Sequence, residues 1–174
     1  CHSTGLDRGY QPETGSYRTT WVQIDVGCEA CHGPGTDHVT WAEAGADWTQ
    51  DPAAGLAVDL SRGGFWRMPA DGGDIAELAE ALMADGAGQI GTCAACHSRR
   101  RPLTDNHHAG TPFLDDHVPA LLDEGLYHAD GQILDEVFVW GSFMQTAMYR
   151  AGVVCSDCHE PHSGALIAEG NAVC

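Results

Sequence analysis

Apolar residues along the chain form only a few long periodic runs. Over residues 74–85 they recur at helical spacing, and Gly86 follows, so a helix is predicted there. The longest predicted helix covers residues 133–150 and is apolar on most of its faces. Such a pattern is typical of a helix packed on several sides rather than one facing water.

Shorter elements are predicted around these two helices. Residues 37–44 read as a short helix with Asp37 as its N-cap, and residues 118–124 read as one or two helical turns. Residues 19–26 have extended character, and residues 45–73, rich in Gly, Asp and Ala, are predicted to be a loop. The expected fold is mainly α with extensive irregular loops and little or no β-sheet.

The composition offers modest material for a protein core. The chain has 174 residues, enough for a single domain over 1–174, and 43% of them are hydrophobic but only 7% aromatic. A chain of this kind needs another source of buried apolar surface, or it stays rich in loops.

One pentapeptide pattern, Cys-x-x-Cys-His, occurs three times in full. Its occurrences are Cys28–His32, Cys93–His97 and Cys155–His159. This is the attachment signature of c-type haem, in which the thiols form thioethers with the vinyl groups and the imidazole binds iron on the proximal side. Zinc and thiol redox sites also use Cys-x-x-Cys, but they do not require a His directly after the second Cys. The sequence therefore predicts haem c, and the porphyrins would then form much of the core.

Both ends of the chain carry parts of the same pattern. Cys1-His2 reads as the end of one motif and Cys174 as the start of another, so we expect a segment of a longer protein. The alternative is a Cys1–Cys174 disulfide in a complete secreted protein. Four haems would then have ligands in this segment, with a fifth begun at Cys174. The predicted thioether residues are Cys1, Cys28, Cys31, Cys93, Cys96, Cys155, Cys158 and Cys174, and the predicted proximal iron ligands are His2, His32, His97 and His159.

Each of these irons needs a sixth ligand or has an open site, and six further His are present. The favoured candidates for distal ligation are His38, His117, His128 and His162. The adjacent pair His107 and His108 lies in a polar loop and ranks lower. Methionine is the alternative ligand and would raise the reduction potential, although helical spacing favours a core role for three of the four. The methionines are Met68, Met83, Met144 and Met148.

The charge balance restricts the partners. The chain has 25 acidic residues against 8 basic ones, a net charge of −17, and every basic residue is Arg. This argues against nucleic acids and anionic membrane surfaces as partners and favours a redox partner protein that is basic or membrane-bound. The alternative is that the acidity suits a salty exterior. No apolar run approaches the ~18 residues that span a bilayer. Covalent haem attachment takes place outside the cytoplasmic membrane, so a periplasmic or extracellular location is predicted.

The segments around these motifs resemble the multihaem cytochromes c that are often fused to tetratricopeptide repeats. Those proteins are related in haem packing to the tetrahaem electron carrier of ammonia oxidation and to hydroxylamine oxidoreductase. The resemblance implies distal ligation by His38 and His162, a less certain role for His128, and more haems beyond Cys174. Residues 45–90 look like a variable insertion. The segments that carry the resemblance are 1–4, 9–10, 19–21, 28–39, 93–100, 119–122, 125–132, 141–145, 152–163 and 170–174.

The predicted function is electron transfer through closely packed bis-His haems, as part of a longer extracytoplasmic conduit, rather than catalysis. One alternative is an oxidoreductase of small nitrogen or sulfur compounds whose open haem lies outside this segment. The Lys-ligated haem of nitrite reductases is excluded here, because the chain has no Lys. The other alternative is an oligomeric form, as a conductive filament or as a subunit of a redox complex.

Overall fold

The computed structural model describes residues 2–58, 60, 64–67, 69–72, 76–81, 86–105 and 107–173. The chain divides into two compact units, each built from two separate segments. The first comprises Cys1–Asp59 and Gly91–Ala120, and the second comprises Leu60–Ile90 and Leu121–Cys174. The prediction of one domain over 1–174 stays a prediction.

The predicted fold class is wrong. Helix accounts for 27% and strand for 17% of the structure, and the described strands form four two-stranded antiparallel sheets. The chain's frequent Gly and Pro residues stop helices early, and the short extended segments between them pair across turns. Extensive irregular loops remain, as predicted.

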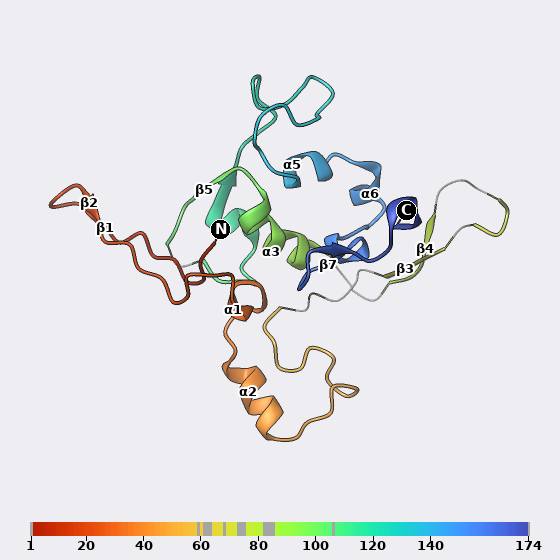
Figure 1. Ribbon diagram of the computed structural model, residues 1–174, viewed down its shortest axis with the longest axis horizontal. Helices are drawn as coiled ribbons and strands as arrows, with labels where there is room; N and C mark the ends of the chain where they lie inside the picture. The colour runs from red at the N-terminus through yellow and green to blue at the C-terminus, as the bar shows by residue number, and fades with distance from the viewer. Residues whose placement is uncertain are drawn as a thin grey trace. The chain divides into compact units, whose positions relative to one another are not determined.

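The first unit begins with an extended ribbon that folds back on itself. Its two arms are joined at the isolated bridges Thr4↔Gln23 and Asp7↔Thr20, which place part of the predicted extended segment 19–26 in backbone pairing. At the tip of the ribbon, Gly15 has φ +61° and its N–H donates to the Gln11 carbonyl at 2.9 Å. The elements of this unit are β1 (Tyr10–Gln11), β2 (Ser16–Tyr17), α1 (Cys28–His32), α2 (Thr36–Glu43), β5 (Arg100–Pro102), α4 (Phe113–Asp116) and β6 (His117–Pro119), labelled where there is room in Figure 1.

Two predicted helices fall in this unit, with different outcomes. The helix over 37–44 is confirmed within one residue by α2, but its N-cap is Gly35 and not the predicted Asp37, which lies in the first turn. The helical turns over 118–124 are wrong, because Val118 lies in β6 opposite Arg101 of β5. Pro119 pushes the residue before it towards extended backbone, and it cannot donate a helical hydrogen bond itself.

Helix α3 (Ala87–His97) begins in the second unit and ends in the first. The hydrophobic pattern did not predict it, because its Ala, Gly, Thr and Cys residues give weak periodicity. Its burial is nevertheless high, with Ile90 5% and Ala94 0% exposed. The second Cys-x-x-Cys-His motif forms its last five residues.

In the second unit, both predictions of a long helix are wrong. Residues 77–81 of the predicted helix over 74–85 form β4 (Glu77–Ala81), which pairs with β3 (Gly64–Arg67). Residues 74, 75 and 82–85 lie outside the described residues. Helical propensity is a weak prior, and pairing with the aromatic strand β3 overrides it here.

The predicted helix over 133–150 is also wrong as one element. It is interrupted, and only α5 (Trp140–Phe143) and α6 (Ala147–Arg150) are helical. Thr146 separates them with ψ 159°, and its side chain caps α6 by accepting the Tyr149 N–H at 3.1 Å. The remaining elements of the unit are η1 (Cys155–Asp157), β7 (His159–Glu160), β8 (Ala165–Leu166) and η2 (Gly170–Val173).

Candidate haem sites

The first complete motif is a helix of its own. In α1, Cys28, Cys31 and His32 stand at positions i, i+3 and i+4, which places both thiols and the imidazole on one helical face. Gly33 ends the helix with φ +75°, and a Cβ at this position would lie 3.0 Å from the Ala57 side chain. Burial raises the pKa of the Cys31 thiol, with a smaller contribution from Cys28.

Thr4 ties the N-terminal half-motif to this helix. The Gly27 N–H donates to Thr4 Oγ1 at 2.8 Å, and that hydroxyl donates to the Asp25 carbonyl at 2.9 Å. Because Thr4 lies two residues after His2 and Gly27 directly precedes Cys28, the predicted proximal ligand His2 lies close to the first complete motif. Cys1 itself lies outside the described residues.

The second motif occupies the end of α3. Cys93, Cys96 and His97 again share one face by the i, i+3, i+4 rule, whereas Ala94 and Ala95 are 0% and 7% exposed. Ser98 closes the helix with its Oγ, which donates to the Ala94 carbonyl at 2.7 Å. The buried side of the helix therefore packs against protein, and the opposite side presents the thiols and the imidazole.

The third motif is fixed by side chains instead of a long helix. Its two middle residues, Ser156 and Asp157, are buried. Gln89 Oε1 accepts the Ser156 N–H at 3.0 Å, and Gln89 Nε2 donates to Ser156 Oγ at 2.9 Å. Asp157 Oδ2 accepts the Val154 N–H at 3.0 Å and the indole N–H of Trp66 at 3.2 Å. The motif then leaves the helical conformation, because His159 begins β7.

None of the six cysteines in these three motifs forms a disulfide. Five of them are half-buried and Cys28 is exposed. Cys174 lies outside the described residues. The thiols are thus placed where a bulky apolar group can reach them.

Two imidazoles near the first motif hold their Nδ1 atoms against backbone carbonyls. His38 Nδ1 lies 2.7 Å from the Ala54 carbonyl oxygen, and His32 Nδ1 lies 3.4 Å from that of Val58. A carbonyl oxygen can only accept, so each Nδ1 donates, and in the neutral ring the lone pair is on Nε2. This arrangement is typical of metal-binding histidines, because it fixes the tautomer and the ring orientation.

Two further imidazoles are held in the same way by carboxylates. His107 Nδ1 lies 2.8 Å from Asp116 Oδ2, and His162 Nδ1 lies 2.9 Å from Glu160 Oε1. Glu160 also accepts the backbone N–H groups of His162 and Ser163. These hydrogen bonds, led by those with the Ser163 and His162 side chains, lower the pKa of Glu160 to about 2.

His107 and His117 lie together in a small aromatic cluster. Their rings meet edge to face with centroids 4.7 Å apart, and His117 stacks on Phe113 at 5.1 Å. His117 is 4% exposed, and its Nδ1 is buried without a hydrogen-bond partner among the described residues. Burial, followed by the neighbouring Arg100 and His107, lowers the pKa of His117, so the ring is neutral and retains a lone pair. The structure brings these two predicted candidates together.

The described contacts do not hold the side chains of the other candidate ligands in this way. His108 and His128 are exposed, and their backbones hydrogen-bond to neighbouring turns. Met144 is half-buried and Met148 is 51% exposed, so the core role that helical spacing favoured for both is weak for Met148. Met68 and Met83 lie outside the described residues.

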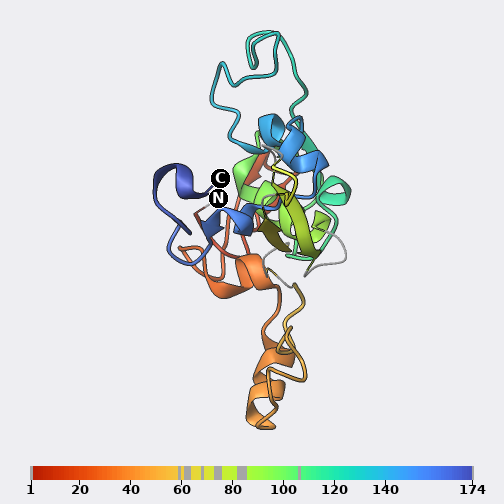
Figure 2. The same ribbon diagram turned by 90° about the vertical axis from the view of Figure 1, so that its right-hand side faces the viewer.

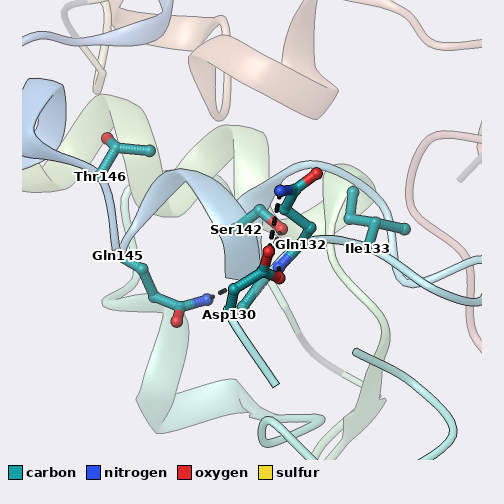
Figure 3. A pocket seen from close by; sticks show the side chains of 7 residues that line it. Asp130, Gln132, Ile133, Ser142, Gln145 and Thr146 are labelled. Atoms are coloured by element: carbon teal, nitrogen blue, oxygen red, sulfur yellow. Dashed lines mark hydrogen bonds between the residues drawn. The ribbon is translucent and has the colours of Figure 1, made fainter. Parts of the chain in front are cut away.

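A pocket of about 460 Å³ in the second unit contains none of these residues (Figure 3). Its most polar feature is Asp130, whose two carboxylate oxygens accept from the backbone and side chain of Gln132 at 3.1 and 3.0 Å. The pocket is lined by Asp130, Gly131, Gln132, Ile133, Ser142, Gln145 and Thr146.

The residues present fit haem c. The first and second motifs present both thiols and the His on one helical face. In the second and third motifs, the two residues between the cysteines are buried. Four imidazoles have Nδ1 held by an oxygen acceptor. Over the described ranges, no group of three or more His, Cys, Asp or Glu side chains is placed to hold a metal ion by itself.

The residues that orient these imidazoles are not predicted by the motifs or the hydrophobic pattern. Asp116 and Glu160 each lie close to a candidate His in sequence, and this proximity was an available signal. The carbonyls of Ala54 and Val58 had no sequence signal, because any residue carries one.

Comparison with known families finds a match at the N-terminal end of the chain. Residues 1–33 match the family model described as cytochrome c554 and c-prime. Over this stretch the chain is similar to cytochromes c. The match implies haem c as the cofactor and a cytochrome-type electron-transfer role. No curated protein and no solved structure matches the chain.

The matched residues contain two of the sites described above. They include the Cys1-His2 half-motif, the ribbon held by Thr4 and the whole of the first complete motif. In the part of the chain that the structure describes, no helix is both long and apolar enough to cross a bilayer.

Proposed function

We propose that the chain is a multihaem electron-transfer cytochrome in which each Cys-x-x-Cys-His motif binds one haem c and most irons have two His ligands. The proposal includes the half-motif at Cys1-His2 and a fifth haem begun at Cys174. Bound haem would supply a one-electron iron couple. The polypeptide would supply thioether anchors, axial imidazoles and a partly water-excluded setting.

One observation carries this proposal: three imidazoles outside the motifs have Nδ1 held by an oxygen acceptor, which places the lone pair of the neutral ring on Nε2. These are His38, His107 and His162. An iron with two imidazoles has no open position for a substrate, and such coordination gives low reduction potentials. A relay of electrons is therefore favoured over catalysis at these sites.

The acidic surface supports a basic redox partner, because complementary charges accelerate association. We place the protein in the periplasm or outside the cell, as part of a longer conduit. The test of the partner is the salt dependence of electron transfer to a basic cytochrome. The association rate is expected to fall as ionic strength rises.

The decisive experiment uses the native holoprotein and its intact mass, EPR spectrum and reaction with CO. We expect one haem for each complete motif, low-spin ferric signals and no CO binding after reduction. The double variant Cys93→Ala, Cys96→Ala is expected to lose one haem. Its matched control, Ala94→Ser, changes the same motif without removing a thiol and is expected to keep all haems. A dominant high-spin ferric signal, or CO binding by the reduced protein, would overturn the bis-His assignment.

A further inference from the structure

The loop over residues 47–58 follows α2 and returns along it, as both Figure 1 and Figure 2 show. It lies within the region that the sequence analysis treated as a variable insertion. Its described contacts are those of an ordered segment. Asp47 Oδ1 accepts the Thr49 N–H at 2.8 Å, and the Gln50 and Asp51 N–H groups donate to the Asp47 carbonyl.

The middle of the loop has an unusual backbone. Ala54 has φ +51° and Gly55 has φ +70°, both in the left-handed region, which Ala rarely adopts. Asp51 supports this turn, because its carbonyl accepts the Ala54 N–H at 2.9 Å and its Oδ2 accepts the Gly55 N–H at 3.2 Å. A non-glycine residue is held in this conformation only where the surroundings determine it.

Two backbone carbonyls of this loop accept hydrogen bonds from imidazoles. The Ala54 carbonyl accepts from His38 at 2.7 Å, and the Val58 carbonyl accepts from His32 at 3.4 Å. His32 belongs to the first motif, and His38 lies in α2. One short loop therefore contacts the Nδ1 atoms of both a predicted proximal ligand and a predicted distal ligand.

The loop is also packed closely against the elements that carry these imidazoles. A Cβ at Gly55 would lie 2.8 Å from the Asp37 carbonyl oxygen and 3.1 Å from Trp41 Cβ, both in α2. The Trp41 ring stacks on the His38 ring, with the two centroids 5.8 Å apart. Val58 is 5% exposed, so its end of the loop is buried. The carbonyls cannot move far without breaking this packing.

We infer that the loop over residues 47–58 is a positioning element for two axial imidazoles, and that its carbonyls lower the reduction potential of the iron that each imidazole binds. This inference rests on the proposed haem ligation. Donation from Nδ1–H to a carbonyl makes Nε2 a stronger electron donor. A stronger donor stabilises ferric over ferrous iron, so the potential falls. The shorter bond, at His38, has the larger effect.

The test compares two glycines of the same backbone class in the native holoprotein. Gly55→Ala introduces a Cβ against the Asp37 backbone and displaces the adjoining Ala54 carbonyl. Gly45→Ala is the matched control, because Gly45 also has positive φ, +65°, but no atom lies within 4 Å of its Cβ position. Both variants carry the same left-handed strain, and only the first disturbs the loop against α2.

We expect Gly55→Ala to raise the potential of one haem and to shift the g values of one low-spin EPR signal. Gly45→Ala is expected to leave every potential and signal unchanged. Equal spectra and potentials for the two alanine variants would overturn the inference.

A measurement on the unmodified holoprotein keeps the test valid if Gly55→Ala does not fold. The hyperfine-shifted Nδ1 protons of His32 and His38 are followed by ¹H NMR after transfer to D₂O. The His38 proton is expected to exchange about tenfold more slowly than that of an imidazole exposed to water. Equally fast exchange would overturn the inference. Absence of low-spin haem in the unmodified protein would instead refute the proposed function, so the two failures are distinguishable.

Discussion

The acceptor opposite each Nδ1 distinguishes the candidate iron ligands from one another. His38 faces a neutral backbone carbonyl, whereas His107 and His162 face carboxylates. A carboxylate withdraws the Nδ1 proton more strongly than a carbonyl does and gives the ring more imidazolate character. Irons bound to His107 and His162 are therefore expected to have lower potentials than the iron bound to His38.

Glu160→Gln tests this ranking directly. The substitution keeps an acceptor oxygen but removes the negative charge 2.9 Å from His162 Nδ1. We expect the potential of one haem to rise, measured by spectroelectrochemical titration of the holoprotein. Glu169→Gln is the matched control, because Glu169 is also exposed and acidic, and it accepts the Ala172 N–H with its backbone carbonyl. An unchanged set of potentials in Glu160→Gln would contradict the role of this carboxylate.

The acid titration of Glu160 is a separate prediction. Its pKa is lowered from 4.5 to about 2, first by the side-chain hydrogen bond with Ser163. The lowered pKa means that the carboxylate stabilises the turn fully above 4.5, and that this contribution is lost as pH falls through about 2. NMR titration of the glutamate side chains should show one with a midpoint near 2, and Ser163→Ala should raise that midpoint. A midpoint near 4.5 for Glu160 would show that the turn does not bind the carboxylate.

The sequence indicates the residues proposed to attach haem more directly than the residues that orient the imidazoles. Each Cys-x-x-Cys-His motif is recognised by residue type and spacing, so Cys28, Cys93 and Cys155 can be proposed as thioether residues from the sequence, and this stays a prediction. His107 ranked low because its neighbours in sequence are polar, yet Asp116 holds it at 2.8 Å. Such a pair depends on how α4 and β6 bring separate residues together, and spacing alone does not encode it.

The helices and strands support the motifs through different contacts. In the second unit, the first turns of α3 reach the third motif through Gln89, which is 2% exposed and bonded to both Ser156 N–H and Ser156 Oγ. Buried polar groups left without partners cost about 1–3 kcal/mol each. Gln89 is thus the main described link between these two elements.

Gln89→Ala is expected to lower the free energy of unfolding by about 1–3 kcal/mol, because it removes two hydrogen bonds to buried groups of Ser156. Chemical denaturation of the holoprotein, followed by the fluorescence of its Trp residues, measures this loss. Gln11→Ala is the control. Gln11 is exposed in β1, and its substitution should change stability by less than about 0.5 kcal/mol. A similar small loss for both variants would mean that the motif does not depend on Gln89.

Secondary structure could be predicted where a turn signal next to the element marks its end. It could not be predicted where pairing with another strand determines the conformation. The turn at Gly33, Pro34 and Gly35 fixes the start of α2, so the helix over 37–44 was found. The segment 77–81 has helix-forming Glu, Leu and Ala but pairs with β3. Its partner lies ten residues earlier in the chain, and single-segment patterns do not report such pairing.

For the molecule as a whole, the polypeptide buries little apolar surface. Large hydrophobic residues remain open to solvent, among them Val22 at 72%, Ile24 at 71% and Leu121 at 71%. The low aromatic content predicted a modest core, and the structure confirms it.

Removal of haem should therefore abolish cooperative folding. Of the described residues, nine hydrophobic side chains are buried, three of them Ala, which is too few to offset the backbone entropy of a chain of 174 residues. Protein produced without the haem-attachment machinery is expected to lack near-UV circular dichroism and a calorimetric unfolding peak, whereas the holoprotein should show both. The double variant Cys93→Ala, Cys96→Ala, which lacks one haem, should retain a peak at lower temperature. A haem-free chain that unfolds in one sharp transition would show that protein–protein packing suffices, and the exposed side chains would then need another partner.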